Sequence, residues 1–351
     1  MVVHKPAGTL YNGYGRPSRV LATAFVCPAQ AGWLERPLAA KAPWDAVRGH
    51  GLLVHAVCID IGNDGHPTGR MRYIMIIKAN AKLNWTLNLL GERADGYHEL
   101  DMLMQSVDLC DELELEDADE FSLTIVGGAE VSAGEDNLVL RAARLLAHEC
   151  GVRTGANIRL VKRIPARAGL GGGSSDAAAV LHALNAHWRA GVGLDELCAL
   201  GMRLGADIPY CLTGGLCRVQ GLGEQVTRMN GAPEVNVVIA MPDAGLSTAA
   251  VFAQSTPCPA QDTRAAAEAL RERDWNWLRH HTANDLQPPA ERLRPGIAKC
   301  QARMYELGAE FARMSGSGSA VFGVFTAERV AEAAARLGAE YTECFAARTL
   351  A

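Results

Sequence analysis

The hydrophobic pattern is sharp from residue 73 onward. Residues 73–77 form an apolar run, and Leu83, Trp85, Leu87 and Leu89 alternate with mostly polar neighbours. Alternation with a period of two is typical of a half-buried strand. Similar patterns predict further strands near 113–115, 121–125, 158–160, 235–241 and 320–325.

Helical spacing separates these strands. Leu138, Ala142, Leu145 and Leu146 recur on one helical face, and 136–137 offers a polar cap. The same spacing predicts helices over about 175–189, 194–204, 265–273, 297–307 and 327–337. Turn residues at 231–233 predict a domain boundary, which gives an α+β protein with domains over 71–231 and 232–351.

Residues 1–70 differ from the rest of the chain. They are rich in Gly, Pro, Ala and Arg, and strand or helix periodicity is hard to find there. A secretory signal is not indicated, because no apolar core with a cleavage site is present. A disordered extension and a start codon assigned too far upstream both explain this region. We favour the second, since the pattern of a folded protein begins at Met71 or Met75.

Composition narrows the class of protein. Of 351 residues, 49% are apolar and 21% are charged, as in an ordinary soluble protein. The net charge of −5 gives no indication of nucleic acid or an anionic membrane as a partner. No apolar run approaches the roughly 20 residues of a membrane span. The ten cysteines are scattered, which predicts reduced thiols in a cytoplasmic protein.

A glycine-rich segment lies between a predicted strand and a predicted helix. It reads Pro165-Ala166-Arg167-Ala168-Gly169-Leu170-Gly171-Gly172-Gly173-Ser174-Ser175. Glycines let backbone N–H groups approach an anion, and a helix start adds unpaired donors and partial positive charge. A tight turn is the alternative, but four glycines with paired serines favour a phosphate site. The segment is neither a Walker A sequence nor the dinucleotide fingerprint.

Three segments together resemble the motifs of the GHMP kinase superfamily. Residues 165–175 resemble its central motif, 78–84 its first, and 314–322 its third, a second glycine-rich turn that approaches the phosphate site. The resemblance implies ATP as the phosphoryl donor. It also implies an N-terminal ATP-binding domain like ribosomal S5 domain 2, a ferredoxin-like C-terminal domain, and a substrate bound between them.

The resemblance assigns the chemistry to two residues. Asp207, in the turn at 205–209, matches the base that accepts the proton of the attacking hydroxyl. Lys82 matches the lysine that pairs with this aspartate and steadies charge on the transferring group. Without the resemblance, Asp207 would be an ordinary turn or capping aspartate, and Lys82 a solvated lysine at the end of a strand.

The continuation at 91–100 resembles the members of the superfamily that phosphorylate a hydroxyl of a cytidylyl sugar alcohol in isoprenoid precursor biosynthesis. The resemblance implies that Tyr97 stacks on the cytosine and that His98 meets its edge. It also implies that Asn84 contacts substrate and that Thr248 and Phe252 form the opposite wall. A homoserine or mevalonate kinase has no use for a cytosine pocket. A catalytically silent binding protein would be expected to lack Lys82 or Asp207.

The remaining assignments concern ATP and its metal. Asn137, Leu138 and Lys162 match positions that approach the adenine, and some members carry asparagine in place of Asp176. Phosphoryl transfer implies Mg²⁺, for which Ser175 is the expected protein contact. The resemblance leaves both a monomer and a homodimer open.

Overall fold

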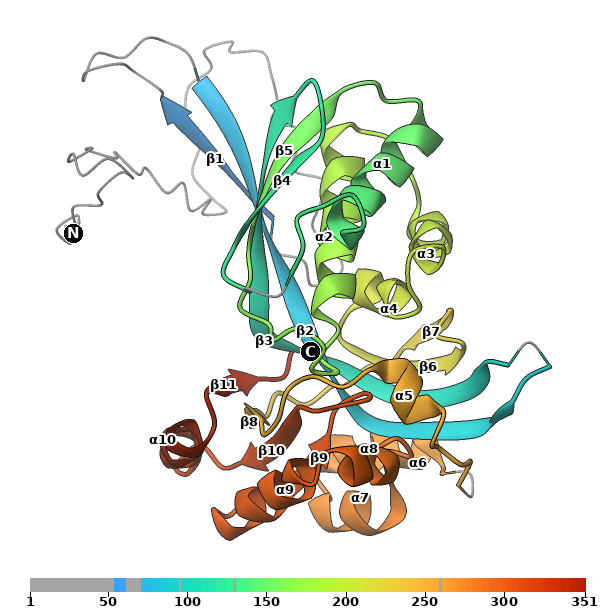
Figure 1. Ribbon diagram of the computed structural model, residues 1–351, viewed down its shortest axis with the longest axis vertical. Coiled ribbons are helices and arrows are strands. Elements are labelled where there is room, and N and C mark those ends of the chain that lie inside the picture. Colours follow the sequence, from blue (N-terminus) through green and yellow to red (C-terminus); the bar gives the residue numbers. More distant parts are fainter. Residues whose placement is uncertain (1–53, 61–70, 95, 129–130, 259–260) are drawn as a thin grey trace, which may run out of the picture. The chain divides into compact units, whose positions relative to one another are not determined.

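The computed structural model describes residues 54–60, 71–94, 96–128, 131–258 and 261–351 (Figure 1). The strands are β1 (Val54–Asp60), β2 (Met71–Glu92), β3 (His98–Ala118), β4 (Ser122–Val126), β5 (Gly155–Val161), β6 (Leu216–Gly221), β7 (Gln225–Arg228), β8 (Asn236–Met241), β9 (Phe311–Met314), β10 (Val321–Phe325) and β11 (Glu343–Arg348). The helices are α1 (Leu138–Cys150), α2 (Gly172–His187), α3 (Leu194–Met202), α4 (Ile208–Thr213), α5 (Thr248–Phe252), α6 (Thr263–Glu272), α7 (Trp275–His281), α8 (Gln287–Leu293), α9 (Gly296–Glu306) and α10 (Val330–Glu340). The α+β fold class is confirmed.

The first sheet is built around the long hairpin of β2 and β3. Its strand order is β1-β2-β3-β5-β4, and β6 pairs with the other half of β3 and with β7. All pairs are antiparallel except β4 with β5, which α1 connects. Register shifts in the β2–β3 pairing lie between Asn80 and Lys82 and between Asn84 and Thr86. Such bulges often re-aim side chains beside an active site.

The helices α1 to α4 cover one face of this sheet (Figure 1). The N-terminal cap of α1 is Asn137, as predicted, and its side chain accepts the backbone N–H of Val139. The second helix, α2, lies against β2 and β3 and carries buried alanines through its first turns. Small residues allow the close approach of helix and sheet, so the start of α2 is fixed against the strands.

The second sheet has the order β11-β8-β10-β9 and is antiparallel throughout. The helices α9 and α10 pack against it. It begins with β8, just after the turn at 231–233, where a domain boundary was predicted; that boundary remains a prediction. Phe311 and Phe322 of this sheet pack with Trp85 of β2, so one apolar cluster includes residues from both sheets.

Several predicted elements differ from the observed ones. The alternating stretch of β2 is not half-buried, because Asn84, Thr86 and Asn88 are as buried as the apolar residues between them. The strand predicted near 113–115 is the end of the 21-residue β3. The helix predicted from about 175 begins at Gly172, inside the glycine-rich segment. When other elements pack on both faces of a strand, its polar positions are buried as well, so alternation in the sequence no longer indicates one face exposed to solvent.

The region before residue 71 contains one strand that the sequence pattern did not reveal. β1 pairs antiparallel with the start of β2, from Val54 opposite Ile77 to Asp60 opposite Met71. The expectation of no regular element in 1–70 is therefore wrong for this segment. Residues 1–53 and 61–70, to which the extension and start-codon hypotheses mainly refer, lie outside the described residues.

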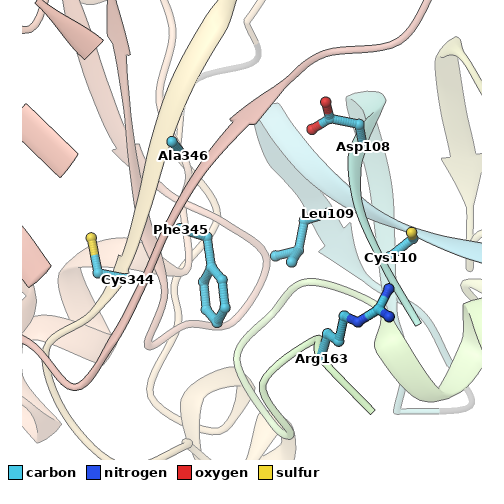
Figure 2. A pocket seen from close by; sticks show the side chains of 7 residues that line it. All are labelled: Asp108, Leu109, Cys110, Arg163, Cys344, Phe345 and Ala346. Carbon is cyan, nitrogen blue, oxygen red and sulfur yellow. The ribbon is translucent and has the colours of Figure 1, made fainter. Parts of the chain in front are cut away.

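One cavity of about 460 Å³ lies between β3 and β11. It is lined by Asp108, Leu109, Cys110, Arg163, Cys344, Phe345 and Ala346. Figure 2 shows Leu109 and Phe345 extending into it from opposite walls. None of the predicted site residues lines this cavity, so its volume says nothing about the chemistry. Among the described helices, none has the length and apolar character needed to cross a bilayer.

Candidate active site

The phosphate loop, residues 165–175, runs from the end of β5 into the first turn of α2. Gly169 and Gly171 both have positive φ, 78° and 72°, which side-chain-bearing residues rarely adopt. A Cβ on Gly169 would lie 2.1 Å from the backbone oxygen of Ser315. Gly171 is the N-terminal cap of α2, and no side chain caps that end. The first N–H groups of the helix are therefore left for another acceptor, such as a phosphate.

Lys82 lies directly against this loop. Its backbone N–H donates to the carbonyl of Leu170 at 3.0 Å, and a Cβ on Gly171 would lie 3.0 Å from its Cγ. Its ammonium donates to Oδ1 of Asn84 at 2.6 Å. The residue is only 4% exposed, so the alternative of a solvated strand-end lysine is wrong. A buried ammonium beside a glycine-rich loop is suited to stabilise negative charge.

The second glycine-rich loop, residues 314–320, contacts the phosphate loop. Ser315 Oγ donates to the carbonyl of Gly169 at 3.0 Å, and the N–H of Ala320 donates to the carbonyl of Ala168 at 3.1 Å. The N–H of Gly316 donates to Oδ1 of Asn84 at 2.9 Å, the same oxygen that accepts Lys82. The first, central and third motifs therefore meet around Asn84.

Asp207 occupies the N-terminal cap position of α4 without capping it. Its backbone is in the right-handed helical region, and its side chain accepts no hydrogen bond from the helix. Pro209 follows in the first turn, where its fixed φ suits a helix start. In the described part of the chain, the half-buried carboxylate of Asp207 has no hydrogen-bond or ion-pair partner. A capping role is thus not observed, and the carboxylate is available to a substrate.

The charges of Lys82 and Asp207 both affect the thiol of Cys211. The pKa of this thiol is raised to about 12, mainly by burial and also by the charge of Asp207, whereas the charge of Lys82 lowers it. The hydroxyl oxygen of Ser175 lies 3.5 Å from the Cys211 sulfur. A Cβ on Gly205 would lie 3.9 Å from Ser174 Oγ. The turn before α4, which carries Asp207, and the start of α2 are therefore neighbours.

The expected metal contact, Ser175, is buried, and its hydroxyl donates to the backbone oxygen of Asn80. The hydroxyl oxygen of Ser175 has lone pairs that can bind a metal, whereas its proton is already donated to Asn80. Among the described residues, no cluster of three or more His, Cys, Asp or Glu side chains could hold a metal. Magnesium commonly binds with few protein ligands together with substrate phosphates. The residues present fit that mode.

Lys162 lies behind the phosphate loop in a buried charge network. Its ammonium donates to Asp111 and, at 2.8 Å, to Asp176, and its side chain is 4% exposed. Asp111 also accepts the backbone N–H groups of Arg163 and Ile164. The network thereby joins β3, the beginning of the loop, and the first turn of α2.

The charges in this network are unequal, since one ammonium faces two buried carboxylates. The pKa of Asp176 is raised to about 8, mainly by burial and also by the charge of Asp111, which together outweigh the lowering effect of Lys162. Burial opposes the charge of Lys162, but Asp176 and Asp111 outweigh it and raise the pKa of Lys162. A proton on Asp176 relieves the excess of negative charge.

The two other residues expected near adenine lie at the start of α1. The side chain of Asn137 caps α1 through Val139 and donates to the backbone oxygen of Ser132 at 2.6 Å. A Cβ on Gly173 would lie 3.7 Å from Cδ1 of Leu138. Leu138 is thus next to the phosphate loop, whereas the amide of Asn137 is already hydrogen-bonded within the chain.

The residues expected to bind substrate form two contacts across long sequence distances. The rings of His98 and Phe252 lie 5.3 Å apart, although one opens β3 and the other ends α5. The hydroxyls of Thr248 and Ser317 are 3.0 Å apart, which joins α5 to the 314–320 loop. Tyr97 is 64% exposed at the tip of the β2–β3 hairpin, beside His98.

Four residues near the site were not found from the sequence: Asp111, Cys211, Asn284 and Ser317. Asp111 precedes alternating leucines and reads as a solvent-facing acid of a strand. Asn284 lies in a polar stretch without periodicity, yet it is 2% exposed. Only Ser317, which stands within the third motif, carried a sequence signal.

Comparisons with known proteins agree with this geometry. The profile of the GHMP kinases N terminal domain matches residues 137–215, and that of the GHMP kinases C terminal matches residues 266–343. The 4-diphosphocytidyl-2-C-methyl-D-erythritol kinase of Pelotomaculum thermopropionicum is 41% identical over 267 residues, covering 75% of this chain and 92% of the relative. The kinase of the same name from Alkaliphilus metalliredigens is 40% identical over 253 residues, covering 71% and 87%.

A solved structure is similar over nearly the same region. The crystal structure of 4-(cytidine 5'-diphospho)-2C-methyl-D-erythritol kinase has a TM-score of 0.69 and 36% sequence identity. It covers 79% of this chain and 100% of its own.

Replacing Asp176 with asparagine should make stability less sensitive to pH. The pKa of Asp176 rises from 3.8 to about 8 on folding, so the stability from its protonated form is lost as the pH rises between these values. Asp176→Asn keeps an oxygen for Lys162 and cannot ionise. Its free energy of unfolding, measured in urea, should therefore rise relative to wild type between pH 5 and pH 8.

Asp262→Asn is the matched control. Asp262 caps α6, and hydrogen bonds from Ala265 and Arg264 hold its pKa below 3.8, so it stays ionised over this range. Its difference from wild type should be the same at pH 5 and pH 8. A similarly constant difference for Asp176→Asn would contradict a raised pKa at Asp176.

Proposed function

The chain belongs to the 4-diphosphocytidyl-2-C-methyl-D-erythritol kinases of the GHMP kinase superfamily, and from this we propose that it phosphorylates the 2-hydroxyl of that sugar alcohol at the expense of ATP. The products are the 2-phosphate and ADP, in the non-mevalonate route to isoprenoid precursors. The observation that carries the proposal is the unpartnered carboxylate of Asp207, in a turn whose Gly205 lies next to Ser174 of the phosphate loop.

The phosphates of ATP are proposed to bind at the phosphate loop and the first turn of α2. The free N–H groups at this helix start and the glycines with positive φ support this role. Leu138, next to Gly173, would face the adenine. Lys162 would act indirectly. Its ammonium binds Asp111 and Asp176 and thereby holds the phosphate loop against β3.

Magnesium is proposed to arrive on the phosphates of ATP. When bound, it neutralises charge that develops on the phosphoryl oxygens. The hydroxyl oxygen of Ser175 would complete its shell, and that of Ser174 is the neighbouring alternative in the same loop.

In the proposed chemical step, the oxygen of the 2-hydroxyl forms a bond to the γ-phosphorus while the bond from that phosphorus to the β,γ-bridging oxygen breaks. Asp207 accepts the proton of the hydroxyl. Such transfers are largely dissociative, so a carboxylate suffices as the base and positioning matters most. Lys82, held by Asn84, places its ammonium where negative charge develops.

The cytosine is proposed to bind at the hairpin tip. His98 and Phe252 present neighbouring rings, and exposed Tyr97 adds a third aromatic face from the same hairpin. Thr248, linked to Ser317, brings this pocket next to the 314–320 loop. Asn84 would contact the sugar alcohol through the second N–H of its NH₂ group, since its oxygen already accepts Lys82 and Gly316 and the NH₂ group donates to the sulfur of Met102 at 3.5 Å. We further propose a cytoplasmic enzyme, monomeric or homodimeric, without a nucleic-acid partner.

A coupled ADP-release assay tests the proposed function. With Mg·ATP, the protein should release ADP in the presence of 4-diphosphocytidyl-2-C-methyl-D-erythritol and not with homoserine or mevalonate. Release with another acceptor would keep the roles of Asp207 and Lys82 but overturn the cytosine pocket. A folded protein that releases no ADP with any acceptor would favour a silent binding protein.

Asp207→Ala should lower kcat by about 10²–10⁴-fold, the range of a lost general base. The KM for ATP should change little, because the carboxylate does not hold the phosphate loop. Asp195→Ala, an exposed aspartate in the first turn of α3, is the control and should retain wild-type kcat. A near wild-type kcat for Asp207→Ala would remove this residue from the mechanism.

His98→Ala should weaken binding of the cytidylyl substrate. An aromatic contact contributes about 0.5–1.5 kcal/mol, so its KM should rise by up to about 10-fold while the KM for ATP stays constant. His148→Ala, on the exposed side of α1, is the matched control. A fall in kcat with an unchanged KM would contradict a role in base binding.

A further inference from the structure

Asn284 is a second asparagine, besides Asn84, that binds the 314–320 loop. Its Nδ2 group donates to the carbonyl oxygens of Met314, at 2.9 Å, and Gly316, at 2.8 Å. Its Oδ1 accepts the N–H of Leu286 at 3.0 Å. The residue is 2% exposed, and both donors of its amide are used on this one loop.

The segment around Asn284 is fastened to β2, the strand that carries Lys82. The N–H of Leu87 donates to the carbonyl of Ala283 at 3.1 Å, and the carbonyl of Leu87 accepts the N–H of Asp285 at 2.9 Å. The N–H of Leu89 donates to the carboxylate of Asp285 at 2.8 Å. Asn284 is therefore fixed in position relative to β2 by three hydrogen bonds, one through Ala283 and two through Asp285.

Both polar groups of Gly316 are held by asparagine side chains. Its N–H donates to Asn84, and its carbonyl accepts from Asn284. Gly316 has a φ of 54°, and a Cβ there would lie 2.8 Å from the oxygen of Gly169 and 3.1 Å from the ammonium of Lys82. The position of Gly316 thus sets how closely the 314–320 loop approaches the lysine and the phosphate loop.

We propose that Asn284 is a positioning residue for phosphoryl transfer, which it serves by fixing Gly316 against Lys82 and the phosphate loop. This inference rests on the proposed function. If the two N–H donors of Asn284 were lost, the carbonyl of Gly316 would no longer be held, and the 314–320 loop would shift relative to Lys82. A displacement of about 1 Å can cost about 10²-fold in rate, so the effect should fall on kcat. The KM values should change less, because Asn284 contacts neither the hairpin tip nor α1.

Asn284→Asp tests the proposal, because it keeps the shape and the acceptor for Leu286 but removes both donors. Its kcat in the ADP-release assay should fall about 10–100-fold, with both KM values within about threefold of wild type. Asn185→Asp is the matched control: Asn185 donates to the carbonyl of Val192 at 2.8 Å and accepts its N–H at 3.0 Å, at the far end of α2. It should lose stability but keep its kcat.

A second readout separates this proposal from the proposed function. In hydrogen–deuterium exchange, peptides covering 314–320 should exchange faster in Asn284→Asp than in wild type, while those of α2 stay unchanged. Asn284→Ser, which is neutral and smaller, carries the same expectations should the aspartate variant fail to fold. A wild-type protein without turnover would refute the proposed function alone. Unchanged exchange over 314–320, or a kcat within twofold of an active wild type, would overturn the role of Asn284.

Discussion

The side-chain oxygen of Asn84 is the point on which the site depends. This fully buried atom accepts the ammonium of Lys82 and the N–H of Gly316. Lys82 in turn binds the phosphate loop through its backbone, and Gly316 belongs to the loop that holds the phosphate loop from the other side. One oxygen therefore relates the lysine and both glycine-rich loops, which come from three distant parts of the chain.

Two sets of acids have different tasks in this arrangement. Asp111 and Asp176 are buried with Lys162 and are used to join β3, the loop and α2. Buried ion pairs seldom add much net stability, but breaking one leaves an uncompensated charge and is costly. Asp207 is half-buried and without a partner in the described part of the chain. The network fixes the loop, and the unpaired carboxylate is left for the substrate.

Local patterns in the sequence predicted those parts of the site that depend on local chemistry. The glycines of the phosphate loop and the cap at Asn137 were both visible, whereas Lys82 was assigned only through the resemblance. The resemblance to a known superfamily added Asp207, His98 and Phe252, and the rings of the last two do lie together. Their pairing depends on tertiary structure, which spacing along one sequence does not encode.

The missed features share one cause, since each is a polar group whose partner is remote in sequence. Asp111 and Lys162 are 51 residues apart, and Asn284 and Gly316 are 32 apart. The burial of both faces of β2 was not predicted for the same reason. Asn84, Thr86 and Asn88 have the pattern of solvent-facing residues, but in the folded protein a second layer covers them. Periodicity distinguishes apolar from polar residues, but it does not identify which polar residues are buried with a partner.

The most direct test of the central claim identifies the atom that receives the phosphoryl group. The measurement is a series of ³¹P NMR spectra of a reaction mixture that contains the protein, Mg·ATP and 4-diphosphocytidyl-2-C-methyl-D-erythritol. The account predicts a new phosphomonoester signal on the sugar alcohol, equal in amount to the ADP formed, with the diphosphate signal of the substrate retained. Free phosphate as the main product, or a change at the diphosphate, would contradict it.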